Sequence, residues 1–370
     1  MKIVADKNIP YLKGIVESFG DVTYLDGAAF SHETIKDAEV LIVRTVTRFD
    51  ETLLKDTAVK LICSATIGYD HIDTAYCDRH SIVWHNAPGC NSGSVQQYVI
   101  SSLITIAEKK GFDIKDKTIG IVGVGNVGKK VARACEVLGM KVLLNDPPRE
   151  ALEETNNFVS LQTIMEQADI ITFHTPLIKD GQYKTYYLAD QSFFSSLKRR
   201  PIIINSARGG IINTQAIKEA MQNSSISGAI IDCWENEPTI DLEYMNMVDI
   251  ATPHIAGYSA DGKANATRMS LDAIADFYKL DKTPISKIKE PSPDNPIIDL
   301  NPLDVSDNRV YSSILNTYNP MADFSRLKTA PNTFKELRNS YPLRREYFAY
   351  HIKNASDEEQ KILLQLGFKI

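Results

Sequence analysis

Short apolar runs recur along the first three quarters of the chain, and stretches of helical character separate them. The runs are four to six residues long and rich in Val, Ile and Leu, which is typical of buried β-strands. A regular alternation of strands and helices predicts parallel sheets covered by helices. The first set of predicted strands comprises residues 2–5, 21–24, 40–43 and 61–64, and the second comprises residues 117–122, 141–145, 170–173, 202–205, 228–232 and 248–253.

Two long helices frame the second set of strands. A predicted helix over residues 94–108 leads into this set, and another over residues 264–278 follows it. Beyond that helix, Pro284, Pro291, Pro293, Pro296 and Pro302 exclude long regular structure from a linker at residues 283–306. The rest of the chain contains helix-like stretches at residues 333–338 and 357–366.

The C-terminal segment, of roughly 65 residues, is small for a domain that folds by itself. Its apolar and aromatic side chains therefore predict packing against another subunit. Arg344 and Arg345 have two interpretations, a solvated pair or a reach into a partner's phosphate site, and the sequence leaves both open. The apolar and aromatic residues concerned are Tyr311, Leu315, Tyr318, Phe324, Tyr347 and Phe348.

Residues 123–128, Gly-Val-Gly-Asn-Val-Gly, form a dinucleotide-binding fingerprint between a predicted strand and a predicted helix at residues 129–138. Gly123 permits a tight turn, Gly125 lets backbone N–H groups approach a pyrophosphate, and Gly128 allows close packing of the helix. Asp146 ends the next strand about 20 residues further on, where a carboxylate can bond the ribose 2′-OH. This arrangement favours NAD over NADP, although Arg149 could accommodate the 2′-phosphate of NADP.

Arg208, Glu237 and His254 each follow the C-terminal end of a predicted strand, which is the edge where open α/β sheets bind ligands. Oxidation of a 2-hydroxy acid needs a cation for the carboxylate, and the planar fork of arginine suits it. Histidine suits the proton transfer because it titrates near neutral pH, and a neighbouring carboxylate fixes its tautomer. We therefore predict Arg208 as the anion clamp, His254 as the acid/base and Glu237 as its partner. Taken singly, the three have simpler interpretations: a surface cation, a core histidine and an acid at a helix start.

The composition of the chain excludes several other classes of protein. The 370 residues carry a formal net charge of −6, with 43% hydrophobic and 24% charged residues, so bulk nucleic-acid binding is not favoured. Five cysteines without metal-ligand spacing fit a reducing compartment, and we expect neither disulfides nor a metal site. No apolar run reaches the roughly 18 residues that span a bilayer, and the N-terminus does not resemble a signal peptide. The expected location is the cytoplasm.

The stretches around the candidate catalytic residues resemble the D-isomer-specific 2-hydroxyacid dehydrogenase family. They are Asn-Ser-Ala-Arg-Gly-Gly at 205–210, Asp-Cys-Trp-Glu-Asn-Glu-Pro at 232–238, Thr-Pro-His-Ile-Ala-Gly-Tyr at 252–258 and His-Thr-Pro-Leu at 174–177. The resemblance implies an NAD-dependent oxidoreductase with Arg208, Glu237 and His254 as its catalytic residues. It places the cofactor on Gly123, Gly125, Asn126, Val127, Gly128, Asp146, Thr175, Ser206, Ala207, Asp232 and Gly257.

The same resemblance implies an α/β fold with two Rossmann-like, doubly wound parallel-sheet domains and an active-site cleft between them. A small α+β dimerisation domain is expected at the C-terminus. The implied boundaries are residues 1–93 with 259–285 for a discontinuous substrate-binding domain, 94–258 for the NAD-binding domain and 286–370 for the dimerisation domain.

Within this family the chain is similar to the branch that oxidises 4-phospho-D-erythronate in vitamin B6 synthesis, on stretches such as Asp-Pro-Pro-Arg at 146–149. That branch implies a homodimer and substrate contacts from Thr45, Thr66 and Tyr258. A sibling enzyme such as a 3-phosphoglycerate dehydrogenase is one alternative, because it would share every catalytic residue. An NAD-sensing binding protein on the same fold is the other, although the absence of low-complexity segments favours an enzyme.

Overall fold

The computed structural model describes residues 1–153, 157–301 and 308–370. Pro302 and the end of the predicted linker, residues 303–306, lie outside the described residues. The chain forms two compact units, each built from two separate stretches of sequence. The first unit comprises Met1–Asn91 and Ser259–Pro291, and the second comprises Ser92–Tyr258 and Ser292–Ile370.

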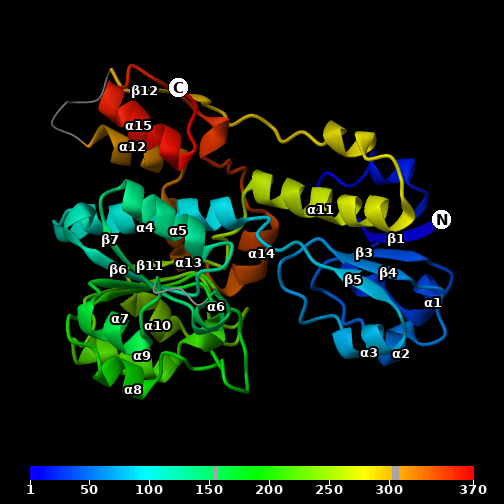
Figure 1. The fold of residues 1–370 in the computed structure, drawn as a ribbon, viewed down its shortest axis with the longest axis horizontal. Coiled ribbons are helices and arrows are strands. Elements are labelled where there is room, and N and C mark those ends of the chain that lie inside the picture. The colour runs from blue at the N-terminus through cyan, green and yellow to red at the C-terminus, as the bar shows by residue number, and fades with distance from the viewer. Residues whose placement is uncertain (154–156, 302–307) are drawn as a thin grey trace. The chain divides into compact units, whose positions relative to one another are not determined.

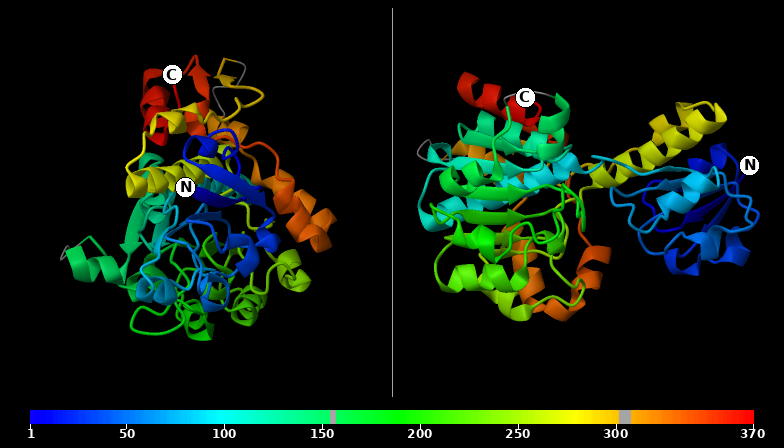
Figure 2. Two further views of the ribbon diagram at one scale, coloured as in Figure 1. Left: turned by 90° about the vertical axis from the view of Figure 1, so that its right-hand side faces the viewer. Right: turned by 60° about the horizontal axis from the view of Figure 1, so that its bottom comes forward.

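A five-stranded parallel sheet in the order β2-β1-β3-β4-β5 forms the first unit. Its elements are β1 (Lys2–Asp6), β2 (Asp21–Leu25), β3 (Val40–Val43), β4 (Leu61–Ser64), β5 (Val83–His85), α1 (His32–Ile35), α2 (Glu51–Leu54), α3 (Thr74–Arg79) and α11 (Ala260–Tyr278). Successive side chains of a strand point to opposite faces. Ile3 and Ala5 therefore pack on the face that α11 covers, whereas Val4 packs on the face of the three short helices (Figure 2).

Six parallel strands in the order β11-β10-β9-β8-β6-β7 form the sheet of the second unit. Its elements are β6 (Thr118–Val122), β7 (Lys141–Asn145), β8 (Ile170–Phe173), β9 (Ile202–Asn205), β10 (Gly228–Ile231), β11 (Ile250–Ala251), α4 (Ser92–Lys110), α5 (Gly128–Val137), α6 (Pro147–Glu153), α7 (Leu161–Gln167), α8 (Gln191–Ser195), α9 (Thr214–Gln222) and α10 (Leu242–Met247). Figure 1 shows α4 and α5 on one face of this sheet and α7 to α10 on the other. Ile202 and Ile204 pack on the first face and Ile203 on the second. Because both faces are buried, the strands are continuous apolar runs.

The strand order of this sheet reverses at β6, which pairs with β7 on one side and β8 on the other. In open α/β sheets, ligands bind outside the carboxyl ends of the strands at such a switch point. Gly123 directly follows β6, and Thr175 closely follows β8. The topology therefore brings two of the predicted cofactor residues to the edge where a ligand is expected.

The C-terminal stretch forms the predicted small α+β region. Its elements are β12 (Ile297–Asp299), β13 (His351–Lys353), α12 (Arg309–Thr317), α13 (Pro320–Thr329), α14 (Phe334–Asn339) and α15 (Asp357–Leu366), with β12 and β13 paired in parallel. Helices α12 and α15 lie against α4 and α5 (Figure 1), and Tyr318 and Tyr347 are buried in the same core. The prediction that these two tyrosines pack against another subunit is wrong, because the core around Tyr98 of α4 already covers them.

Other predicted boundaries differ from the structure for local reasons. Strand β11 spans two residues instead of six, because the Thr252 hydroxyl turns back to Asp232 and Pro253 lacks an N–H for a ladder. Helix α11 begins earlier than predicted, because the Ser259 hydroxyl accepts a hydrogen bond from the Gly262 N–H as an N-cap. The strands β5, β12 and β13 have three residues each, too few for a clear periodicity. No helix among the described residues is both long and apolar enough to cross a membrane.

Candidate active site

Arg208 lies in a tight turn that follows β9. The Asn205 side chain closes this turn, accepting a hydrogen bond from the Ala207 N–H at 3.1 Å and donating one to the Arg208 carbonyl oxygen at 3.0 Å. A Cβ on Gly209 would lie 1.9 Å from the carbonyl oxygen of Trp234, so only glycine permits this approach. The turn that carries Arg208 is therefore in close backbone contact with the segment that carries Glu237.

Glu237 and His254 form a hydrogen-bonded pair, with 2.7 Å between Oε2 of Glu237 and Nδ1 of His254. The other carboxylate oxygen of Glu237 accepts the Trp234 N–H at 2.7 Å, so both oxygens are held in place. Burial raises the pKa of Glu237, but the charge of His254 and the hydrogen bond to it outweigh burial and leave that pKa below its ordinary value. The pair is thus an ionised carboxylate that orients an imidazole.

Asp232 holds the loop that presents His254. Its side chain is 1% exposed, and its carboxylate accepts the Thr252 hydroxyl and the N–H groups of Ile255 and Ala256 at 2.7–2.9 Å. Burial raises the pKa of Asp232 above its ordinary value, although these hydrogen bonds act in the opposite direction. Through these contacts the carboxylate fixes the backbone on both sides of His254. A contact of Asp232 with the cofactor remains a prediction.

Cys233 is a neighbour of the pair that the sequence interpretation did not single out. Its sulfur lies within 4.8 Å of a ligand atom from Glu237 and from His254. Burial raises the pKa of the Cys233 thiol well above its ordinary value, so the thiol stays protonated. The carboxylate of Glu237 and the imidazole of His254 bond each other, so this pair is arranged for proton transfer. The neutral sulfur of Cys233 lies beside it.

The glycine fingerprint forms a cradle between β6, β8 and α5. Gly123 has a φ of +89°, and a Cβ there would lie 2.8 Å from the backbone of His174 and Thr175. A Cβ on Gly128 would lie 2.0 Å from the Gly123 carbonyl oxygen, whereas one on Gly125 would meet nothing within 4 Å. Together with the exposed Asn126 and the half-buried Val127, Gly125 leaves open space at the start of α5, as the binding of a pyrophosphate requires.

Asp146 directly follows β7 and faces the same cradle. Its carboxylate accepts the Val124 N–H at 2.8 Å and the Arg149 N–H at 3.1 Å, which fixes it beside the fingerprint. The Arg149 guanidinium donates two hydrogen bonds to Glu153, at 2.7 and 3.0 Å, and one to the Val124 carbonyl oxygen. Because Arg149 is already paired with a carboxylate, it is poorly placed to receive a 2′-phosphate, which supports NAD.

Two buried hydroxyls beside the cradle show that the residues present fit a dinucleotide. Thr175 Oγ1 and Ser206 Oγ are buried and have no hydrogen-bond partner among the described residues. A buried polar group without a partner costs free energy, so these two hydroxyls indicate a ligand that provides the missing hydrogen bonds. Ser206 and Ala207 follow β9, and Gly257 lies in the His254 loop, so these predicted cofactor residues also lie at the carboxyl edge of the sheet.

The predicted substrate residues fall on both units. Thr45 is exposed after β3, and Thr66 follows β4, where its hydroxyl donates to the Gly68 carbonyl oxygen at 2.9 Å. Tyr258 belongs to the second unit and closes the His254 loop, with its N–H donating to the Ile255 carbonyl oxygen. Tyr258 thus lies in the loop that presents His254. Arg44, the residue before Thr45, is paired with Asp6 at 2.8 Å.

The C-terminal stretch contributes side chains to this region that the sequence interpretation missed or misjudged. Arg344 is 4% exposed and donates to the Ile255 carbonyl oxygen at 3.0 Å, so it braces the His254 loop. Both interpretations of Arg344, a solvated side chain and a reach to another subunit, are wrong, because the rings of Tyr318 and Tyr341 enclose its guanidinium. Arg345 is also buried and therefore not a solvated cation. The interleaving of arginines and tyrosines along residues 338–347 was the available signal.

Known proteins resemble this chain over most of its length. The sequence profile of the D-isomer specific 2-hydroxyacid dehydrogenase, NAD binding domain, matches residues 95–256, and that of a domain of unknown function matches residues 291–367. Erythronate-4-phosphate dehydrogenase of Bacteroides fragilis is 50% identical over 353 residues, covering 95% of this chain and 99% of the relative. The protein of the same name from Porphyromonas gingivalis is 45% identical over 369 residues, covering 100% of both chains.

Among solved structures, an NAD⁺-bound 3-phosphoglycerate dehydrogenase from Entamoeba histolytica is 30% identical, with a TM-score of 0.64. It covers 75% of this chain and 95% of its own. The match confirms the predicted fold and NAD as the cofactor of the second unit. The similarity to the two erythronate-4-phosphate dehydrogenases extends over nearly the whole chain and therefore includes most of the C-terminal region.

Proposed function

Because the chain belongs to the D-isomer specific 2-hydroxyacid dehydrogenase family, among its erythronate-4-phosphate dehydrogenases, we propose that it oxidises 4-phospho-D-erythronate with NAD. The product is (R)-3-hydroxy-2-oxo-4-phosphooxybutanoate, and the reaction serves pyridoxal phosphate synthesis. The observation that carries the proposal is the 2.7 Å contact between Glu237 and His254, next to the turn of Arg208. A base, its orienting carboxylate and an anion clamp are the groups that this oxidation needs.

His254 takes the proton from the substrate's 2-hydroxyl group. Its Nδ1 faces Glu237, which leaves Nε2 for the hydroxyl. As the imidazole becomes positive, the ionised Glu237 stabilises it, and the Trp234 N–H prevents the carboxylate from turning away. Proton transfer by a positioned side chain contributes typically about 10²- to 10⁴-fold to the rate.

Arg208 holds the substrate's carboxylate through its guanidinium, whose planar fork fixes the orientation of the acid. Its Nη1 donates to the Ala207 carbonyl oxygen at 2.7 Å, which restricts the side chain to one direction. When bound, NAD would supply the acceptor for the hydride that leaves the substrate's C2. Asp146, Thr175, Ser206 and the fingerprint backbone would hold the dinucleotide. Thr45, Thr66 and Tyr258 are the proposed substrate contacts.

The test is a comparison of initial rates of NADH formation with 4-phospho-D-erythronate, 3-phospho-D-glycerate and D-lactate. We expect kcat/KM for the erythronate phosphate to exceed the others by at least about a hundredfold, which corresponds to roughly 2.7 kcal/mol. Faster turnover of 3-phosphoglycerate would keep the mechanism and reject the substrate. NAD binding without turnover of any of the three acids would reject the enzyme in favour of an NAD sensor.

We also propose that the protein forms a homodimer through its C-terminal region and that it acts in the cytoplasm. Large apolar side chains stay exposed there, namely Ile297, Leu343, Phe348, Leu364 and Ile370. All five cysteines are buried and unpaired, as a reducing compartment allows. Sedimentation velocity tests the dimer: Leu364→Glu should shift the protein toward monomer, whereas Leu152→Glu, an exposed leucine on α6, should not. Equal sedimentation of both variants and wild type would reject this surface.

A further inference from the structure

We propose that Arg338, on α14 of the C-terminal region, is a second cation of the candidate active site and binds the phosphate of the substrate. This inference rests on the proposed function and names a residue that the family's Arg-Glu-His set does not contain. It assigns the C-terminal region a part in substrate selection, in addition to any part in assembly.

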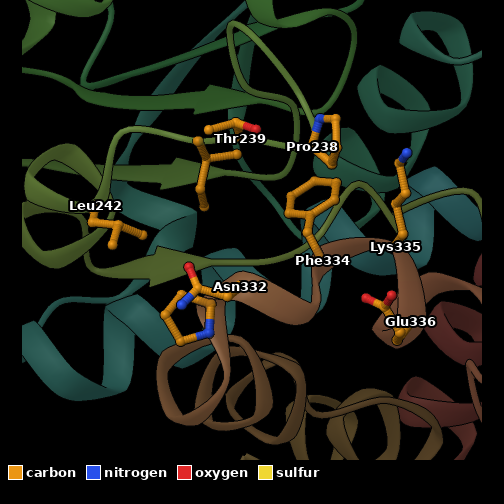
Figure 3. Close-up of a pocket in the computed structure, with 9 residues that line it drawn as sticks. Pro238, Thr239, Leu242, Asn332, Phe334, Lys335 and Glu336 are labelled. Atoms are coloured by element: carbon orange, nitrogen blue, oxygen red, sulfur yellow. The ribbon is translucent and has the colours of Figure 1, made fainter.

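Helix α14 is anchored on the segment that carries Glu237. Phe334 is 1% exposed and packs in the core cluster that contains Trp234, Ile240 and Tyr244. Figure 3 shows the Phe334 ring beside Pro238, the residue next to Glu237. Both residues line a cavity of about 280 Å³. The position of α14 relative to the catalytic segment is therefore set by buried apolar contacts.

Arg338 lies one helical turn after Phe334, so the two side chains share one face of α14. Its guanidinium lies over the ring of Tyr258, with 5.4 Å between its central carbon and the ring centroid. The Tyr341 ring meets the same Tyr258 ring edge-on at 5.8 Å between centroids. Arg338 therefore points toward the loop that presents His254.

The charge of Arg338 acts on the catalytic residues themselves. After burial and His254, whose effects are larger, Arg338 is among the groups that set the lowered pKa of Glu237. Arg208 and Arg338 both oppose the larger effect of burial on the pKa of the Cys233 thiol. Two arginines, one before and one after this short segment in the sequence, thus act on it through their charges.

Arg338 has no carboxylate partner among the described residues, and its Nε is buried without a hydrogen-bond partner. Other arginines of this part of the chain are paired, such as Arg326 with Asp323 and Arg309 with Glu359. Arg338 is half-buried, and its buried Nε costs free energy unless an acceptor such as an anion completes it. The substrate carries two anionic groups, and Arg208 takes the carboxylate, so the phosphate is the group left for Arg338.

The test is steady-state kinetics of the NAD-loaded, full-length enzyme with Arg338→Met. We expect KM for 4-phospho-D-erythronate to rise about 10- to 100-fold, the loss of a charge-assisted hydrogen bond, with a smaller change in kcat. D-Erythronate, which lacks the phosphate, should bind the variant and the wild type equally, measured as substrate or as competitive inhibitor. Lys335→Gln removes an exposed cation from the same helix and should leave all constants unchanged.

Equal losses toward both acids would overturn the inference, because Arg338 would then only support Tyr258. An unchanged KM for the phosphorylated acid would overturn it as well. If Arg338→Met does not fold, the same comparison with Arg338→Lys decides: a loss confined to the phosphorylated acid supports the contact, and equal losses reject it. A wild-type enzyme inactive on 4-phospho-D-erythronate would instead reject the proposed function.

Discussion

Replacing Glu237 by glutamine tests the role of the pair with His254 most directly. Oε1 of Glu237 accepts the Trp234 N–H at 2.7 Å, so the amide oxygen of the glutamine has to take that position. The amide NH₂ then faces Nδ1 of His254 in place of Oε2, which lies 2.7 Å away in the wild type. An NH₂ group only donates, so Nδ1 has to be the acceptor and Nε2 carries the proton. The imidazole is then held in the tautomer that cannot take the substrate's proton.

This argument predicts a loss of about 10²- to 10⁴-fold in kcat/KM with 4-phospho-D-erythronate, the contribution of a positioned general base. The loss should appear in kcat, while the Kd for NAD stays the same, because the cradle of Gly123 and Asp146 is intact.

Glu235→Gln is the matched control for Glu237→Gln. Glu235 lies two residues earlier and bonds the Tyr187 hydroxyl and the Thr214 N–H at 2.7 and 2.9 Å, away from His254. This variant should lose at most about 1 kcal/mol of stability and keep its kcat. A loss below about tenfold in Glu237→Gln, or an equal loss in both variants, would refute the tautomer argument.

Three further predictions concern the clamp, the turn and the cofactor, and a fourth concerns acid stability. Arg208→Lys should lower kcat/KM by about 10- to 100-fold, because a point charge cannot replace the fork; a loss under about threefold would contradict this. Gly209→Ala should lower stability by about 1–3 kcal/mol and also reduce kcat, and a variant with wild-type Tm would be incompatible with the 1.9 Å approach to Trp234. Asp146→Ser should lower the preference for NAD over NADP by at least about tenfold, measured as the ratio of kcat/KM with NAD to kcat/KM with NADP. An unchanged ratio would contradict the role of Asp146. The pKa of Glu237 lies below its ordinary 4.5, so its ionised form stabilises the folded state above that pH, and this stability is lost as the pH falls through the lowered pKa. Tm should therefore fall more steeply in acid for wild type than for Glu237→Gln. Parallel curves of Tm against pH for the two proteins would contradict this prediction.

Local pattern was enough to predict most of the two parallel sheets and the positions of the candidate catalytic residues after their strands. Strands buried on both faces are apolar throughout, so runs such as Ile202–Asn205 stand out in the sequence. Each motif residue follows such a run, and the carboxyl ends of parallel strands share one edge. The contact between Glu237 and His254 could therefore be predicted before any distance was known.

Only the tertiary structure decided what the C-terminal region contacts. Tyr318 and Tyr347 were predicted to cover another subunit, but they are buried against this chain's own helices. Arg338 lies 80 positions after Tyr258 in the sequence and yet over its ring. The local sequence around an aromatic residue or an arginine does not determine which residues that side chain contacts. Its burial is set by elements that meet only after the chain has folded.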